Sequence, residues 1–402
     1  MTTRRRFSMG PAALVAAAFI GPGTVVTASL AGANYGYALM WALVFSVLAT
    51  MILQEMSARL GVVTQQGLGE NIRAAIKQPW VRQLVVLLIF AAVVIGNSVY
   101  QGGNISGARM GLADLVPFDG QYIPVLLGGL AGVILWQGSY KLVEKVLIGL
   151  VLLMSVAFLA TFILTQPDWA ALFAGLLVPS VPTGSILMVV ALIGTTVVPY
   201  NLFLHASSCA EKWHSPEQLD EARQDIYISI PLGGLISLAI VATAASAFFG
   251  KALTIEGAAD LGQALQPLFG DAATTFMALG LFAAGLSSSL TAPLASAYAL
   301  SGVLGYSNSL KDKKFRTIWL AILSIGVVVA SLGLKPIEVI IFAQVANGIL
   351  LPFIAVFLVW VCNQPRLGKH RNSWQQNILG IIVCFIAVGL GARSIAAAFG
   401  WL

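Results

Sequence analysis

The stretch Gly21-Pro22-Gly23-Thr24 decides the fold of this chain, together with its counterpart Val198-Pro199-Tyr200-Asn201. Each lies inside an apolar run that is long enough to cross a lipid bilayer. Because Gly and Pro break a helix, a bilayer tolerates them only where protein, water or a solute satisfies the freed backbone groups. Two matched broken spans, one in each half of a chain, indicate the binding site of a transporter. The alternative is that the prolines merely kink structural helices.

The composition is that of a membrane protein. Of 402 residues, 58% are hydrophobic and only 9% are charged, and the mean hydropathy is +0.89. A soluble domain carries about a quarter charged residues. The cysteines are too few and too widely spaced for a disulfide framework or a metal knuckle: Cys209, Cys362 and Cys384. Arg4-Arg5-Arg6 resembles the start of a signal peptide, but the long apolar run that follows predicts a retained first span.

The hydropathy pattern predicts eleven membrane spans. They cover residues 11–33, 38–60, 82–107, 121–139, 143–165, 184–212, 225–249, 272–304, 316–334, 337–362 and 375–399. With these spans, eighteen Lys and Arg residues fall on one side of the membrane and four on the other. The positive-inside rule then places the amino terminus inside and the carboxyl terminus outside. The membrane that we predict is a bacterial inner (cytoplasmic) membrane. The net charge of +6 is therefore topological and does not indicate a nucleic-acid partner.

We predict a single transmembrane domain over 1–402, built from two repeats. The first repeat covers about 11–165 and the second about 184–362, with an extra helix at about 375–399. Each repeat has an odd number of spans and begins with a broken one, so the second repeat is inverted relative to the first. This is the 5+5 inverted repeat of an all-α, leucine-transporter-type fold with helices 1 and 6 broken. No sequence feature predicts an oligomeric state.

Short motifs are spread along nearly the whole chain. They are Ala58-Arg59-Leu60-Gly61, Lys141-Leu142, Val178-Pro179-Ser180-Val181-Pro182, Asn201-Leu202-Phe203-Leu204-His205, Gly285-Leu286-Ser287-Ser288-Ser289 and Leu351-Pro352-Phe353. In this order and spacing, the chain resembles the Nramp (natural resistance-associated macrophage protein) transporters. The resemblance implies the same broken-helix fold.

The chemistry that this resemblance implies is not carried over. Members of the family bind divalent transition metals through an Asp-Pro-Gly-Asn motif and a Met-Pro-His motif. Here Gly21 and Thr24 stand for the Asp and Asn, while Val198 and Tyr200 stand for the Met and His. The family's acidic residues in span three are also replaced by uncharged residues, over 96–101.

The positions of the acidic residues lead to the same prediction without the family. None of the sixteen Asp and Glu residues falls near the middle of a predicted span, and Glu55 comes closest. A divalent ion stripped of water needs anionic oxygens or, for transition metals, imidazole or sulfur ligands. We therefore predict no metal site.

Both broken spans turn a helix amino terminus towards the middle of the membrane, near Thr24 and near Tyr200-Asn201. Such ends carry unsatisfied N–H groups and partial positive charge, so without a carboxylate they favour an anion. The hydroxyls of Thr24 and Tyr200 are expected to donate further hydrogen bonds. The predicted substrate site consists of Gly21, Gly23, Thr24, Thr195, Val198, Tyr200, Asn201 and Gln344.

An anion that enters a negative-inside cell needs a driving ion, and span eight offers successive hydroxyls at Ser287-Ser288-Ser289. The resemblance to leucine-transporter-type folds implies Na⁺ at Ser288 and Ser289, beside backbone near Gly21 and Thr24. Close helix packing explains small residues equally well. His205 has two interpretations, as a proton relay or as a packing residue.

The favoured interpretation is a secondary transporter that imports a small monovalent anion, such as bicarbonate, by alternating access with Na⁺ coupling and no other cofactor. One alternative is a divalent-metal transporter (Mn²⁺, Fe²⁺ or Mg²⁺) with a degenerate site. Others are a transporter of small amino acids or carboxylates and a transport-dead sensor. No enzyme is predicted, since no intramembrane catalytic motif is visible.

Overall fold

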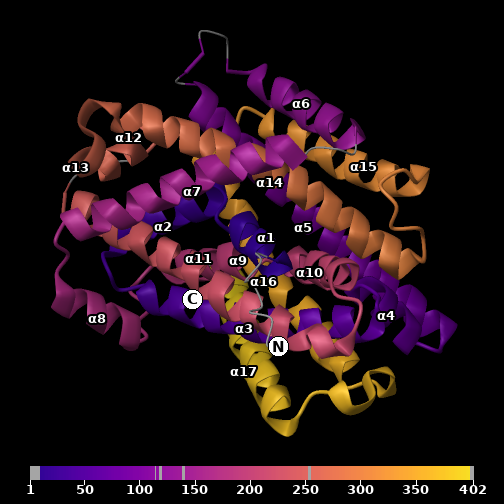
Figure 1. The fold of residues 1–402 in the computed structure, drawn as a ribbon. Coiled ribbons are helices and arrows are strands. Elements are labelled where there is room, and N and C mark those ends of the chain that lie inside the picture. Colours follow the sequence, from indigo (N-terminus) through magenta and orange to yellow (C-terminus); the bar gives the residue numbers. More distant parts are fainter. Residues whose placement is uncertain (1–9, 114, 117–119, 138–140, 252–254, 399–402) are drawn as a thin grey trace, which may run out of the picture.

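The computed structural model describes residues 10–113, 115–116, 120–137, 141–251 and 255–398, and every regular element in these ranges is helical (Figure 1). The predicted basic segment Arg4-Arg5-Arg6 lies outside the described residues.

The first half of the chain forms α1 Pro11–Phe19, α2 Pro22–Tyr35, α3 Met40–Thr64, α4 Leu68–Ala75, α5 Pro79–Ala113, α6 Ile123–Gln137, α7 Lys141–Leu164 and α8 Trp169–Leu177. The second half forms α9 Ile186–Thr196, α10 Pro199–Lys212, α11 Leu219–Phe248, α12 Ala258–Gly262, α13 Gln266–Phe269, α14 Ala273–Leu304, α15 Lys313–Ala330, α16 Pro336–Cys362 and α17 Trp374–Ala398. Short 3-10 helices are η1 Pro216–Gln218, η2 Gln263–Leu265, η3 Gly270–Ala272 and η4 Pro365–His370.

Both predicted breaks are present. The first separates α1 from α2 and the second separates α9 from α10. The half-helix α2 begins at Pro22 rather than near Thr24, because proline is well suited to the first position of a helix, where its missing N–H is no loss. Pro199 begins α10 in the same way.

Within the described residues, seven helical segments are long and apolar enough to cross a membrane. They are Met40–Thr64, Pro79–Ala113, Ile186–Lys212, Pro216–Phe248, Ala258–Leu304, Pro336–Cys362 and Trp374–Ala396. The halves α1 and α2 have 9 and 14 residues, so neither crosses a bilayer alone. The count of eleven spans stays a prediction. Three segments predicted as connections contain short α-helices: 61–81 contains α4, 166–183 contains α8, and 250–271 contains α12 and α13.

Small residues allow the helices at the centre of the bundle to approach closely. A Cβ atom added to Gly61 on α3 would lie 2.1 Å from the backbone oxygen of Ala206 on α10. The neighbouring Ser57 hydroxyl donates to the Leu202 oxygen on the same helix. Glycine at such a contact lets two backbones meet, as is usual between membrane helices. This contact fixes α10, and therefore the second break, against α3.

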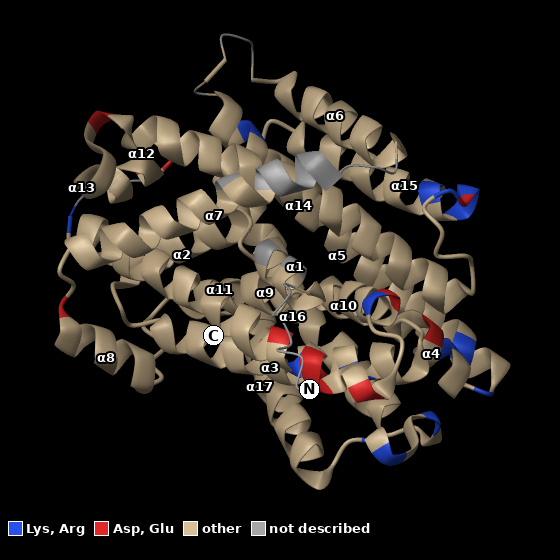
Figure 2. Cartoon of the chain, viewed as in Figure 1, with Lys and Arg blue, Asp and Glu red and all other residues tan. Residues whose placement is uncertain are grey.

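One end of the bundle is rich in Lys and Arg residues, and we call it the basic end: α4, η4 and the loop between α14 and α15 (Figure 2). Hydrogen bonds join its parts. Arg366 on η4 donates to the Gln66 side chain before α4 at 3.1 Å, and Asn308 donates to Glu70 on α4. Burial raises the pKa of the Glu70 carboxyl, and hydrogen bonds partly offset this rise. The gathering of Lys and Arg at one end accords with the predicted charge asymmetry, while the side of the membrane that it faces stays a prediction.

Two buried carboxylates at the basic end hold neighbouring helices together, and one of them binds the start of α1. Asp225 on α11 accepts hydrogen bonds from the backbone N–H of Ala12 at 2.8 Å and of Gly10 at 3.1 Å, at the start of α1. Glu55 on α3 pairs with Arg59 at 3.1 Å and with Arg223 on α11 at 3.0 Å. Both acidic groups therefore hold helices together and lie away from the breaks.

The contact at Gly61 gives a test of the packing. Gly61→Val places methyl groups where the Ala206 backbone lies, and overpacking of this kind costs about 1–3 kcal/mol. We expect a lower melting temperature in detergent. The matched control is Gly129→Val, since a Cβ at Gly129 has nothing within 4 Å. Equal melting temperatures for the two variants would contradict the close approach of α3 and α10.

Candidate substrate site at the two helix breaks

The two breaks are joined by a pair of buried hydroxyls. Thr24 Oγ1, at the start of α2, lies 2.8 Å from Thr195 Oγ1, near the end of α9. Thr24 Oγ1 also donates to the backbone oxygen of Phe19, at the end of α1. Because the Thr24 proton is used on Phe19, the Thr195 hydroxyl is the donor in the contact between the two threonines. One side chain thus connects both halves of the first break to the second.

This geometry corrects one expectation from the sequence. The Thr24 hydroxyl was expected to donate to the substrate, but its proton is held by the carbonyl of Phe19. The physical reason is that a helix end inside a membrane leaves carbonyl groups without partners, and a nearby hydroxyl satisfies one of them. Thr24 belongs to the site as the residue that fixes its geometry.

Two other helices meet the first break through its glycines. A Cβ atom added to Gly23 would lie 2.2 Å from Gln344 Nε2 on α16, so the amide rests directly on the backbone. A Cβ added to Gly21 would lie 2.7 Å from Ser288 Oγ on α14. The structure therefore brings Gln344 and Ser288 to the glycines of the first break, while their role in binding stays a prediction.

The second break is built around Tyr200. Val198 is the residue before α10, and its oxygen accepts from the Asn201 N–H at 3.1 Å. The Tyr200 ring packs edge-on against Tyr100 of α5, with ring centroids 5.2 Å apart. Tyr200, Asn97 and Asn347 line a small cavity of about 10 Å³, which is about the room that one water molecule needs.

Each half-helix offers few backbone donors to a substrate. Proline occupies the first position of both α2 and α10 and has no N–H. The third N–H of each helix bonds back across a turn, from Thr24 to the Gly21 oxygen at 3.1 Å and from Asn201 to the Val198 oxygen at 3.1 Å. The N–H groups of Gly23 and Tyr200 remain without an intrahelical acceptor. The positive end of each helix dipole is still present.

Several polar atoms near the breaks are buried without a hydrogen-bond partner in the described structure. They include Tyr200 Oη, Asn201 Nδ2 and Oδ1, Gln344 Oε1 and Ser289 Oγ. None of these side chains is more than 2% exposed. A buried polar group without a partner costs about 1–3 kcal/mol, so these positions favour a bound solute or water.

The sequence did not single out Asn97, Gln101 or Asn347 as site residues. Asn97 donates to Ser296 Oγ at 2.6 Å and Gln101 donates to the Ser289 oxygen at 3.2 Å, so the two amides tie α5 to α14. Asn347 carries an unpartnered amide in the small cavity. Their spacing in the sequence could have indicated them. Asn97 and Gln101 are four residues apart, and Asn347 follows Gln344 by three, so the two members of each pair share one helix face.

No group of three His, Cys, Asp or Glu side chains comes together anywhere in the described ranges. His205 is fully buried on α10, four residues after Asn201. The donors and acceptors around the breaks are hydroxyls, amides and backbone groups. This set carries no negative charge.

Sequence comparison identifies the relatives of this chain. Residues 12–397 match the family described as natural resistance-associated macrophage protein-like. The chain belongs to the Nramp family. It is 32% identical to the divalent metal cation transporter MntH of Klebsiella pneumoniae (strain 342), over 98% of this chain and 93% of that protein. It is 30% identical to the protein of the same name from Yersinia pestis (strain Pestoides F), over 96% and 93%.

Solved structures support the same fold. A mutant of the Eremococcus coleocola manganese transporter has a TM-score of 0.80 at 20% identity, covering 100% of this chain and 90% of that one. MhsT in complex with L-phenylalanine has a TM-score of 0.65 at 15% identity, with 99% of each chain covered. The Nramp chain is thus a multi-pass membrane transporter of leucine-transporter type and not an enzyme.

The bridging hydroxyl of Thr24 gives the second test. In Thr24→Val the Phe19 carbonyl and the Thr195 hydroxyl both lose their partner, so we expect a loss of about 1–3 kcal/mol in stability. Thr24→Ser should retain most of the wild-type value. The control is Thr27→Val one turn along α2, because the buried Thr27 hydroxyl has no hydrogen-bond partner to lose. Thermal unfolding in detergent measures all three, and a Thr24→Val variant as stable as Thr27→Val would refute the bridge.

Proposed function

We propose that this Nramp-family chain transports a small monovalent anion by alternating access, with bicarbonate as the best candidate. One observation carries the proposal: the Thr24 hydroxyl at the start of α2 meets Thr195 just before the second break. The side chains that contact the two breaks in the described structure include no Asp or Glu. Where the family's motifs carry Asp, Met and His, this chain has Gly21, Val198 and Tyr200. These replacements remove the carboxylate, sulfur and imidazole ligands that a metal ion would use, while the helix dipoles at the breaks remain.

The side chains at the site suit a planar oxyanion. Asn201 Nδ2 is buried without a partner and is therefore available as a donor, and Gln344 Nε2 lies directly over the Gly23 backbone. The Gly23 and Tyr200 N–H groups add backbone donors at the positive ends of α2 and α10. None of the residues that meet at the breaks is Lys or Arg, which favours a single negative charge over a phosphate or sulfate.

Sodium is the proposed coupling ion. Ser288 Oγ lies beside the Gly21 backbone, and Ser289 Oγ is buried without a partner on the next residue of α14. Neutral hydroxyl and carbonyl oxygens are suitable ligands for a monovalent hard cation. A cation at this position would also reduce the cost of moving an anion into a negative-inside cell.

A divalent metal ion is the second candidate, and the relatives favour it. Two proteins at least 30% identical over nearly the whole chain are named divalent metal cation transporters. Without a carboxylate, such an ion would have to keep its water shell and be held by neutral oxygens such as those of Gln344 and the Thr195 carbonyl. The relatives' names support the cation, while the side chains of this site support the anion.

Uptake into proteoliposomes tests the two candidates. We expect saturable uptake of labelled bicarbonate by the wild-type chain and no concentrative Mn²⁺ uptake in the absence of bicarbonate. Thr24→Asp and Thr24→Asn have nearly the same shape, but Asp adds a negative charge and, unlike the Asn amide, an ionised Asp cannot donate to the Phe19 carbonyl. Thermal unfolding of both variants measures the part of the difference that comes from the bridge. A full charge in a low-dielectric site is worth several kcal/mol, so Thr24→Asp should transport bicarbonate at least about tenfold more slowly than Thr24→Asn.

Two results would contradict the anion proposal or its placement at the breaks. Concentrative Mn²⁺ uptake without bicarbonate by the wild-type chain would overturn the anion proposal. Equal bicarbonate rates for Thr24→Asp and Thr24→Asn would place the anion away from the breaks.

The proposed sodium site has a test of its own. Ser288→Ala removes the hydroxyl beside Gly21 and therefore one oxygen ligand of the proposed Na⁺. If that ligand contributes about as much free energy as one hydrogen bond, half-maximal bicarbonate uptake should require about tenfold more Na⁺. Ser287→Ala is the matched control on the adjacent, less buried position. If choline replaces Na⁺ with no loss of rate, Na⁺ has no part in transport.

A further inference from the structure

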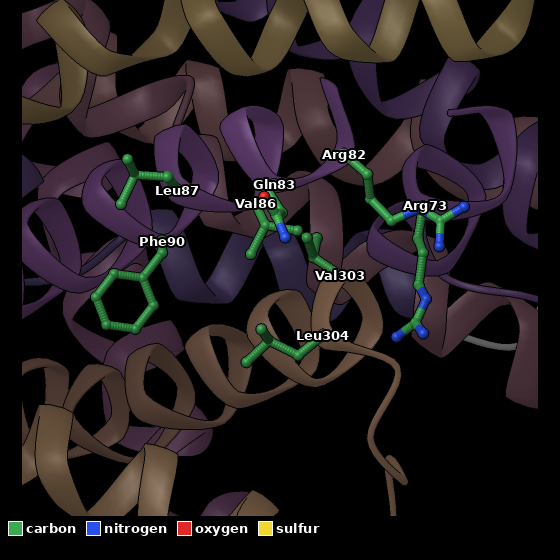
Figure 3. A pocket seen from close by; sticks show the side chains of 8 residues that line it. All are labelled: Arg73, Arg82, Gln83, Val86, Leu87, Phe90, Val303 and Leu304. Carbon is green, nitrogen blue, oxygen red and sulfur yellow. The ribbon is translucent and has the colours of Figure 1, made fainter. Parts of the chain in front are cut away.

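A groove at the basic end has a charged end and an apolar end. It lies between α4, the start of α5 and the end of α14, and has a volume of about 360 Å³. Arg73 and Arg82 lie together at one end, while Leu87 and Phe90 lie at the other, with Leu304 between them (Figure 3). The groove is separate from the helix breaks, so its role does not depend on the cargo.

The two arginines are available for an anionic partner. Arg82 donates through Nε and Nη2 to the Ile76 oxygen, at 3.3 and 3.0 Å, which fixes its guanidinium at the end of α4. The Arg73 guanidinium lies over Gly305, where an added Cβ would be 1.5 Å from Nη1. In the described part of the chain, no carboxylate pairs with either group. The nearby Glu70 accepts from Asn308 instead.

The apolar end of the groove faces outwards. Leu87 is 62% exposed and Phe90 is 45% exposed, and both belong to a helix that is long and apolar enough to cross the membrane. Trp80, at the start of the same helix, is 68% exposed, as is typical of aromatic residues at a membrane interface. The arginines therefore lie at headgroup depth, and the apolar end lies along the acyl chains.

We propose that this groove binds an anionic phospholipid. The phosphate accepts hydrogen bonds from Arg73 and Arg82, and one acyl chain lies along Leu87 and Phe90. Arginine is the best side chain for phosphate because its planar guanidinium donates two parallel hydrogen bonds. Basic pockets between membrane helices bind acidic lipid headgroups for the same reason. A free phosphate would leave the apolar half of the groove unused, so the occupant is a lipid. The bound lipid joins α4 to α5 and α14.

The test is a titration of the purified full-length chain with lipid, in which native mass spectrometry measures the bound fraction. The probes are a phosphatidylglycerol, a phosphatidylcholine with the same acyl chains, and glycerol phosphate as the headgroup alone. Each basic residue near an anionic headgroup is worth about a factor of five in affinity. The double variant Arg73→Gln/Arg82→Gln should therefore bind phosphatidylglycerol about 25-fold more weakly than the wild type. Lys311→Gln/Lys313→Gln removes the same charge from exposed positions, one in the neighbouring loop and one at the start of α15, and should change affinity less than about twofold.

Further variants distinguish the two halves of the groove. Leu87→Ala/Phe90→Ala alters outward-facing side chains, so the fold is retained, and it should weaken phosphatidylglycerol binding while leaving the preference over phosphatidylcholine intact. Equal binding of the two lipids by the wild type would overturn the proposal, as would equal losses in the arginine and lysine double variants. Glycerol phosphate that binds as tightly as phosphatidylglycerol would show a free-anion site and also overturn it.

Discussion

Every backbone group inside a bilayer needs a hydrogen-bond partner, and the structure depends on how this requirement is met at the two breaks. Thr24 meets it at the first break by donating to the Phe19 carbonyl, which would otherwise be unpaired at the end of α1. The same hydroxyl accepts from Thr195, near the end of α9. The positions of α1, α2 and α9 are therefore coupled through one side chain. The site between them is a consequence of this coupling.

The distribution of charge follows from the same requirement. The buried carboxylates Glu55 and Asp225 pair with arginines or with the start of α1, at the basic end of the bundle. The breaks are left with hydroxyls, amides and helix dipoles. Since Asp225 holds the first turn of α1, movement of α1 away from α11 has to break those hydrogen bonds. In the alternating-access cycle that we propose, opening of α1 on this side would have to break the Asp225 contacts.

The sequence predicted the features that depend on local chemistry. The breaks at Pro22 and Pro199 follow from the missing N–H of proline, and the approach of Ser288 to Gly21 was expected from the family fold. The direction of the Thr24 hydroxyl could not be predicted, because it depends on where the Phe19 carbonyl lies after α1 has packed. The role of Asn347 was missed for a similar reason. Its cavity exists only where α5, α10 and α16 meet.

Family membership and cargo are separate questions for this chain, because a fold persists through changes in a few ligands. The central claim is that the breaks bind no bare divalent metal ion. Titration of the purified chain with Mn²⁺, with the heat of binding measured by isothermal titration calorimetry, tests it most directly. With neutral ligands only, no saturable binding is expected below about millimolar Mn²⁺, an affinity of about −4 kcal/mol. Saturable Mn²⁺ binding in the micromolar range that is lost in a Gln344→Ala variant would contradict the claim.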